Sequence, residues 1–144
     1  MSLKTRQDQI IRDFSEISNW EDRYKKIIAL GKDLPAISDR LKTDEAKIKG
    51  CQSQVWLHAK LNEQGLMEII GDSDALLVRG LVAILISMYS QSTPAEVLSN
   101  PATFLKEMGF ETNLSPSRAN GLFSMIKQIQ RFAMAFQVLL QSKK

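Results

Sequence analysis

The residue of this sequence with the clearest capacity for chemistry is its single cysteine, Cys51, which lies in the polar stretch KIKGCQSQVW (residues 47–56). Free cysteines usually behave as small buried hydrophobes, whereas the neighbours here are small or polar: Gly50, Gln52 and Ser53. A thiolate in a flexible loop is a nucleophile, and without a second thiol its adducts are not resolved as an internal disulfide. The residues alone fit either a reactive thiol or an incidental one.

The single histidine, His58, is the other candidate for chemistry near Cys51. It lies seven residues along a predicted strand, with no obvious third group to orient it as a base, so the pattern favours an exposed strand histidine. One cysteine and one histidine do not supply a zinc or cluster site within one chain. No phosphate-binding glycine motif is present either, so we expect neither a metal nor a cofactor in this chain.

Composition indicates a single globular domain over residues 1–144, because 44% of the residues are hydrophobic and 24% are charged. The formal net charge is only +3, and the basic residues are spread along the sequence, so a nucleic-acid partner is not expected. The longest apolar run, residues 75–89, is interrupted by Arg79 and Gly80 and is shorter than the ~20 residues of a membrane span. A lone cysteine and the lack of a signal-like start favour a cytoplasmic protein.

The elements that must position Cys51 include a predicted hairpin. Apolar residues alternate through residues 55–61, which is typical of a half-buried strand. A turn follows at residues 62–65, and residues 67–71 form the returning strand. A short strand at residues 46–48 adds a third, so we expect an α+β fold with a small antiparallel sheet of about three strands and helices packed on one side.

Helical periodicity and capping residues predict the remaining elements. The segments are residues 5–14, 19–32, 74–90, 94–99, 101–108 and a last helix from 116 to about 140, with an exposed connection over residues 33–45. Caps are expected from Asn19, from Asp72 or Ser73, from Thr93 before Pro94 and from Ser115 before Pro116. From Leu122 to Leu140, apolar residues recur at intervals of three and four residues, which predicts one continuous apolar stripe along the last helix.

The sequence resembles the SufE family of bacterial sulfur-acceptor proteins over roughly residues 10–135. Four blocks carry the resemblance, in the family's order and approximate spacing: NWEDRYKKIIALGKDLP, IKGCQSQVW, GDSDALLVRGL and LSPSRANGL. The GCQS sequence is more similar to SufE proper than to its paralogue CsdE. The resemblance implies a compact α+β fold and a cysteine, here Cys51, that accepts sulfane sulfur as a persulfide.

Two further residues gain a candidate role from the resemblance. Asp74 lies in the GDSD block, which in the family is near the cysteine loop, so it is a candidate for holding that loop closed, beside a plain capping role. Arg118 matches a family arginine that stabilises anionic sulfur or contacts the desulfurase, and a surface salt bridge is the alternative. Ala119 and Asn120 stand where more polar residues are expected in relatives, so that corner departs from the family pattern.

The resemblance implies a PLP-dependent cysteine desulfurase as donor, SufS-like or CsdA-like, and an iron–sulfur scaffold complex, SufBCD-like, as acceptor. Cys51 would take the sulfur, and the chain would stimulate the desulfurase and deliver sulfur for cluster assembly. Because cellular thiols would strip an exposed persulfide, we expect the Cys51 thiol to be shielded until docking moves the loop outward. Two alternatives stay open: an interaction module that activates the desulfurase without carrying sulfur, and a scaffold in which a dimer pools cysteines.

Overall fold

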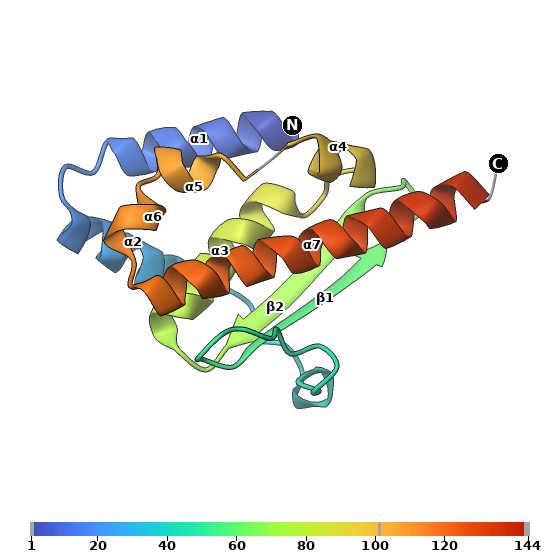
Figure 1. Cartoon of the computed structure of the whole chain (residues 1–144), viewed down its shortest axis with the longest axis horizontal. Helices are drawn as coiled ribbons and strands as arrows, with labels where there is room; N and C mark the ends of the chain where they lie inside the picture. The colour runs from blue at the N-terminus through green and yellow to red at the C-terminus, as the bar shows by residue number, and fades with distance from the viewer. Residues whose placement is uncertain (1, 101, 143–144) are drawn as a thin grey trace.

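A two-stranded antiparallel sheet, β1 (Val55–Leu61) and β2 (Met67–Ser73), lies along one side of the computed structural model, which describes residues 2–100 and 102–142 (Figure 1). The register pairs Val55 with Ser73 and Leu61 with Met67. The fold is α+β, as the alternation in the sequence predicts. The hairpin extends to Ser73, two residues beyond the predicted end.

The expected third strand, residues 46–48, is reduced to a single antiparallel bridge between Lys47 and Trp56. The Ile48 amide donates to the Val55 carbonyl at 2.8 Å, and the Leu57 amide donates to the Ala46 carbonyl at 3.1 Å. After Ile48 the chain turns away into the Cys51 loop, so the pairing stops there. The sheet of the described residues therefore has two strands rather than about three.

The described part of the chain also contains seven α-helices and one short 3₁₀ helix. They are α1 (Leu3–Ser15), α2 (Trp20–Asp33), η1 (Asp39–Leu41), α3 (Leu76–Tyr89), α4 (Pro94–Ser99), α5 (Phe104–Glu107), α6 (Phe110–Asn113) and α7 (Pro116–Ser142). Helix α3 is the central one, with every residue from Gly80 to Leu85 buried, as its continuous apolar run predicts. It packs against α2 and β2, and it also contacts α1 and α7.

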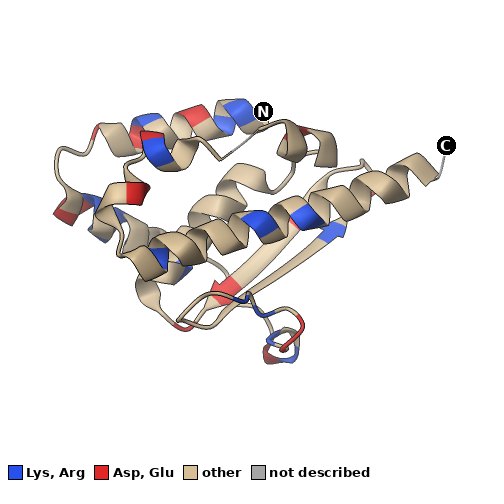
Figure 2. Ribbon diagram, viewed as in Figure 1, with Lys and Arg blue, Asp and Glu red and all other residues tan. Residues whose placement is uncertain are grey.

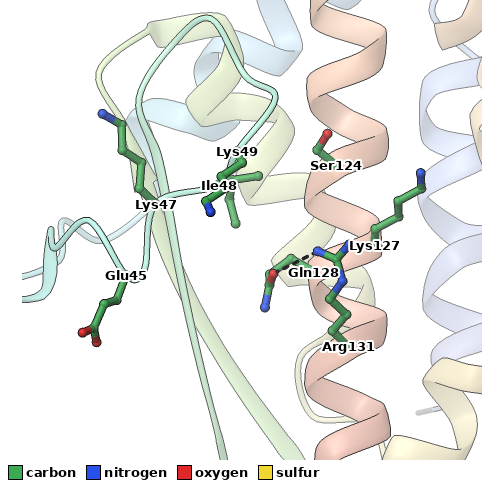
Figure 3. Close-up of a pocket in the computed structure, with 8 residues that line it drawn as sticks. All are labelled: Glu45, Lys47, Ile48, Lys49, Ser124, Lys127, Gln128 and Arg131. Carbon is green, nitrogen blue, oxygen red and sulfur yellow. Dashed lines mark hydrogen bonds between the residues drawn. The ribbon is translucent and has the colours of Figure 1, made fainter.

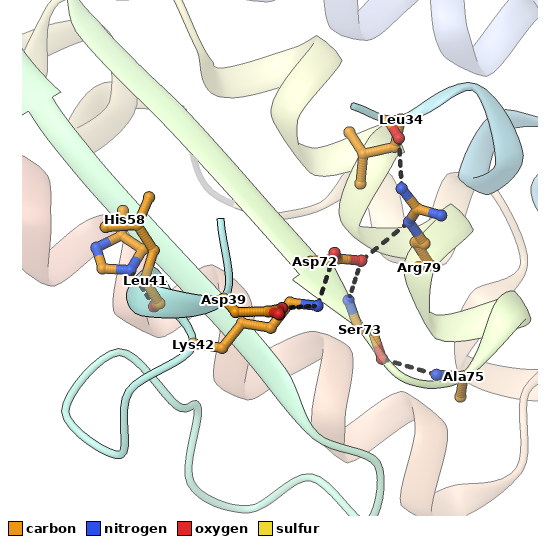
Figure 4. A network of polar contacts seen from close by, with 9 residues as sticks. All are labelled: Leu34, Asp39, Leu41, Lys42, His58, Asp72, Ser73, Ala75 and Arg79. Carbon is orange, nitrogen blue, oxygen red and sulfur yellow. Dashed lines mark hydrogen bonds and ion pairs between the residues drawn. The ribbon is translucent and has the colours of Figure 1, made fainter. Parts of the chain in front are cut away.

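The two faces of the hairpin are covered by different parts of the chain. The inner face carries buried Val55, Leu57 and Ile69 and is covered by α3 and α7. The outer face is partly covered by the connection after α2, whose η1 segment places the Leu41 carbonyl 2.6 Å from Nε2 of His58 (Figure 4). The helices thus lie on one side, as predicted, while a mostly exposed connection lies against the other.

Capping residues account for the helix starts that the sequence predicts. The Asn19 side chain accepts from the Asp22 amide at 2.8 Å, and Thr93 forms a full capping box with Glu96 at the start of α4. The predicted helix at 101–108 is wrong in extent: α5 covers only Phe104–Glu107, and Pro101 lies outside the described residues. The expected loop after Gly109 instead contains one helical turn, α6.

Helix α7 is longer than the body that it packs on, and its C-terminal end projects beyond the hairpin (Figure 1). Its first half is buried at Leu122, Met125 and Ile129. Further along, Val138 is 64% exposed and Leu139 is 50% exposed. The predicted apolar stripe is therefore continuous in sequence but is fully buried only as far as Ala133, with Phe136 partly buried against the core.

Candidate functional site

Cys51 lies in the loop between the Lys47 bridge and β1, with its side chain half-buried against α7. Its thiol donates a weak hydrogen bond to the Gly121 carbonyl, with 3.6 Å between Sγ and oxygen. A Cβ atom at Gly121 would lie 3.2 Å from that Sγ, which is tighter than ordinary contact. Glycine at position 121 therefore lets the thiol approach the helix backbone.

The loop is anchored at both ends. Ile48 is bonded to Val55 through its amide, and the Gln54 amide donates to Oδ1 of Asp74 at 2.9 Å. The Asp74 amide also donates to the Gln54 carbonyl at 3.2 Å. Asp74 thus contacts the end of the cysteine loop rather than acting as a helix cap. The five residues between these anchors, 49–53, include Cys51 at their centre.

Gly50 gives the loop its sharp turn. Its φ angle is +88°, in the left-handed region that strongly favours glycine. A Cβ atom at this position would lie 2.9 Å from Oγ of Ser124 on α7. The backbone angle therefore favours glycine immediately before Cys51, and a side chain there would also push the Ser124 hydroxyl aside.

A cavity of about 150 Å³ opens beside the Cys51 thiol, between the loop, α3 and the start of α7. Of the predicted site residues, Cys51, Gln52, Ser53 and Arg118 all line it. Apolar side chains of Val78, Leu81 and Met125 complete much of the wall. Arg118 is exposed at its edge, and within residues 2–100 and 102–142 its side chain makes no ion pair, so the alternative of a surface salt bridge is not seen there.

The surroundings favour the neutral form of the Cys51 thiol. Burial raises its pKa above the ordinary value, because a thiolate in this half-buried position loses hydration. No charged neighbour acts on the thiol strongly enough to lower the pKa in the described chain. The thiol in the free protein is therefore less nucleophilic than an exposed cysteine at neutral pH.

Next to Asp74, the buried carboxylate of Asp72 has a structural role (Figure 4). Its Oδ1 lies 3.0 Å from Nε of Arg79, and its Oδ2 lies 3.6 Å from Nζ of Lys42. Asp72 therefore ties β2 to α3 and to the connection after α2. The prediction that Asp72 or Ser73 caps this helix is wrong, because α3 begins at Leu76 and its N-cap residue has no side-chain hydrogen bond.

His58 does not join the cysteine site. It lies on the outer face of β1 against Leu41, whereas Cys51 faces α7, so the predicted absence of a Cys/His pair agrees with the geometry. It is half-buried rather than exposed, because η1 lies over it. Among the residues described, no group of three His, Cys, Asp or Glu side chains is arranged to hold a metal ion. None of the described helices is long and apolar enough to cross a membrane.

Gly121 is a site residue that sequence reasoning missed. It is the last glycine of the chain and lies within the LSPSRANGL block, but helical periodicity assigns it no function. Only the folded structure brings it to Cys51, seventy residues earlier in the sequence.

The fold is similar to the solution structure of a hypothetical protein from Thermus thermophilus, with a TM-score of 0.77. The match covers 92% of this chain and 96% of that chain at 18% sequence identity, so it is evidence of a shared fold alone. Residues 8–133 match the model of the SufE family, described as an Fe-S metabolism associated domain. This match spans the Cys51 loop, the hairpin and the covered half of α7, and the chain belongs to the SufE family.

Proposed function

We propose that this chain is a sulfur-acceptor protein in which Cys51 takes the outer sulfur of a cysteine persulfide on a PLP-dependent cysteine desulfurase. The observation that carries the proposal is the setting of the sole thiol, which lies in a doubly anchored loop beside a cavity of about 150 Å³. Membership of a family associated with Fe–S metabolism supports the same chemistry.

The transfer is a thiol–disulfide type of exchange. The Cys51 thiolate attacks the outer sulfur of the donor persulfide, a new S–S bond forms at Cys51, and the donor S–S bond breaks. The donor cysteine leaves as a thiolate and takes up a proton to replace the one that Cys51 lost. No external oxidant or reductant is consumed, because the sulfane sulfur keeps its oxidation state.

The half-buried thiol fits an acceptor that is inactive until it is docked. Burial raises the pKa of Cys51, so little thiolate forms in the free protein. Docking of a donor moves the 49–53 loop outward and exposes the thiol, while Arg118 at the edge of the cavity is positioned to attract anionic sulfur. After loading, the cavity beside Cys51 shelters the added sulfur from cellular thiols.

The partners that suit this role are a SufS-like or CsdA-like desulfurase as donor and a SufBCD-like scaffold complex as acceptor. Removal of sulfur from the donor cysteine frees it for the next turnover, so the chain stimulates the desulfurase. The pyridoxal phosphate chemistry belongs to the donor, and this chain supplies the accepting thiol and the docking surface.

Intact-mass analysis tests the proposal. After incubation with a desulfurase and free cysteine, we expect the wild-type chain to gain one sulfur atom that a reductant removes, and Cys51→Ser to gain none. Cys51→Ser is also expected to lose the stimulation of desulfurase turnover. If Cys51→Ser still stimulates fully, the chain is an allosteric activator and the sulfur-acceptor proposal is wrong.

A further inference from the structure

A second hollow lies on the other side of the Cys51 loop and gathers positive charge. It encloses about 430 Å³ between the segment at residues 45–49 and helix α7. Lys47 and Lys49 belong to the loop side, and Lys127 and Arg131 belong to α7 (Figure 3). We call this hollow the basic groove; Figure 2 shows two neighbouring blue bands along the middle of α7, the helix that supplies two of the four cations.

The basic groove concentrates the charge of the molecule. Four cations and one carboxylate, Glu45, line it, an excess of three that equals the formal net charge of the whole chain. In the described chain none of the four is in an ion pair, whereas Lys4, Lys25, Lys42 and Lys60 all pair with carboxylates. The groove therefore presents uncompensated positive charge to solvent.

The arrangement of these cations gives little stability to the fold. Lys127 and Arg131 are four residues apart on one helix, where like charges repel by roughly 0.2–0.5 kcal/mol. The Arg131 guanidinium donates a long hydrogen bond to the side-chain Oε1 of Gln128 at 3.4 Å, and Nζ of Lys127 lies 5.8 Å from the centre of the exposed Phe123 ring. The two cations are therefore held only by weak contacts on the helix surface and remain available to a partner.

We infer that the basic groove docks an acidic segment of the sulfur donor, so that the donor bridges the loop arm and α7 before Cys51 is released. This inference rests on the proposed function and names its docking surface. Lys49 directly precedes Gly50, so a segment bound in the groove contacts the residue that must move when the loop opens. Uncompensated rim charges accelerate encounter with an acidic partner and fix its orientation.

Other occupants fit the groove less well. Its lining holds no aromatic side chain on which a nucleotide base stacks, so a single-stranded nucleic acid lacks its usual platform. Figure 3 shows the Lys127 side chain on the far side of α7 from Lys47, so the charges are spread along two rims and do not converge on one point. Spread charge on flexible lysine stems matches several carboxylates of a protein segment better than one small anion.

Charge reversal on α7 tests the inference. Lys127→Glu combined with Arg131→Glu keeps a like-charge pair on exposed positions of the helix, so its fold and stability are expected to match the wild type. The matched control is Lys32→Glu with Lys106→Glu, which changes the net charge equally at exposed positions that do not line the groove. Affinity for the cysteine desulfurase of the same organism is measured by biolayer interferometry at low and at physiological ionic strength.

We expect the groove variant to bind the desulfurase at least ~10-fold more weakly at low salt and to show a flatter salt dependence, whereas the control changes little. Lys47→Glu with Lys49→Glu, on the opposite rim, is expected to act in the same direction. Unchanged affinity in the groove variants, or equal weakening in the control, overturns the inference. Displacement of the donor by inorganic phosphate, but not by chloride at matched ionic strength, also overturns it and assigns a small-anion site.

Intact mass separates this result from a failure of the proposed function. If the inference holds, the groove variant still gains sulfur on Cys51 at high donor concentration, since the acceptor thiol is intact. If the wild type never gains sulfur yet its donor affinity depends on the groove, the docking surface stands and the sulfur-acceptor proposal falls. If the wild type gains sulfur and the groove variant gains it with the same concentration dependence, only the docking inference falls.

Discussion

The thiol of Cys51 is held against the backbone of Gly121, with 3.6 Å between Sγ and the carbonyl oxygen. This contact joins the centre of the 49–53 loop to the first half of α7, and it keeps the sulfur half-buried beside a cavity. Together with the Asp74 contact at the loop end, it defines how far the thiol is retracted in the free chain.

The first prediction concerns Gly121→Ala. A methyl group 3.2 Å from Sγ of Cys51 displaces the thiol from the helix, so its reaction with iodoacetamide becomes faster than in the wild type. Alanine is the better helix former by about 1 kcal/mol, so the free energy of unfolding falls by less than the lost contact alone would suggest. Alkylation kinetics and urea unfolding measure the two effects, with Asn120→Ala as the control on the same turn. Slower or unchanged alkylation would contradict the prediction.

The second prediction concerns the anchor at Asp74. Asp74→Ala removes the acceptor of the Gln54 amide, and hydrogen exchange at residues 50–54 becomes faster while exchange in α3 is unchanged. Global stability falls by about 1 kcal/mol, because the lost bond is exposed to solvent. Asp74→Asn retains an acceptor oxygen and is expected to be intermediate. Equal exchange in all three proteins would show that Asp74 does not anchor the loop.

The third prediction is a pH dependence. Burial raises the pKa of the Cys51 thiol, so its alkylation rate in the folded protein rises at higher pH than in the urea-unfolded chain, where the thiol is fully hydrated. The neutral thiol is favoured by folding, so its contribution to stability is fully present below the unfolded pKa and is lost as pH rises through the folded pKa. In the Cys51→Ser variant, which has no thiol to ionise, this fall in unfolding free energy at high pH is absent. The prediction is contradicted if the pH midpoint of the alkylation rate is lower in the folded protein than in the unfolded chain.

The fourth prediction concerns the Asp72 network. Arg79→Leu leaves the buried Asp72 carboxylate without its closest cation, with only Lys42 at 3.6 Å, and is expected to cost ~3–5 kcal/mol of unfolding free energy. Adding Asp72→Asn removes the stranded charge and recovers part of that loss. Urea denaturation of the single and double variants measures the coupling. Strict additivity of the two changes would mean that the pair does not interact.

Local patterns in the sequence were sufficient for most of the fold. Alternation through residues 55–61 predicted β1, and the apolar spacing after Leu122 predicted α7, because both periods follow from backbone geometry alone. The Asn19 and Thr93 caps were predicted correctly for the same reason, since a cap involves residues only three positions apart. Cys51 itself was visible because its polar neighbours do not suit a core cysteine.

Contacts between residues far apart in the chain could not be predicted from local sequence patterns. Asp74 has a partner twenty residues earlier, and its choice between capping and loop contact depends on where α3 begins, which is Leu76. The cations of the basic groove are dispersed in the sequence, because the loop arm and α7 are far apart along the chain and meet only in the fold. The spacing of apolar residues in α7 showed which face of the helix is apolar, but not that full burial of this face ends at Ala133.

The two anchors turn the cysteine loop into a tether of fixed length. Cys51 is three positions from Ile48 on one side and three from Gln54 on the other, and a chain extends by at most ~3.6 Å per residue, so the Cα of Cys51 cannot lie more than roughly 11 Å from either anchor. A donor must bring its own sulfur within that short reach. Any partner whose reactive cysteine is recessed more deeply than the tether can extend is excluded by geometry, whatever its charge.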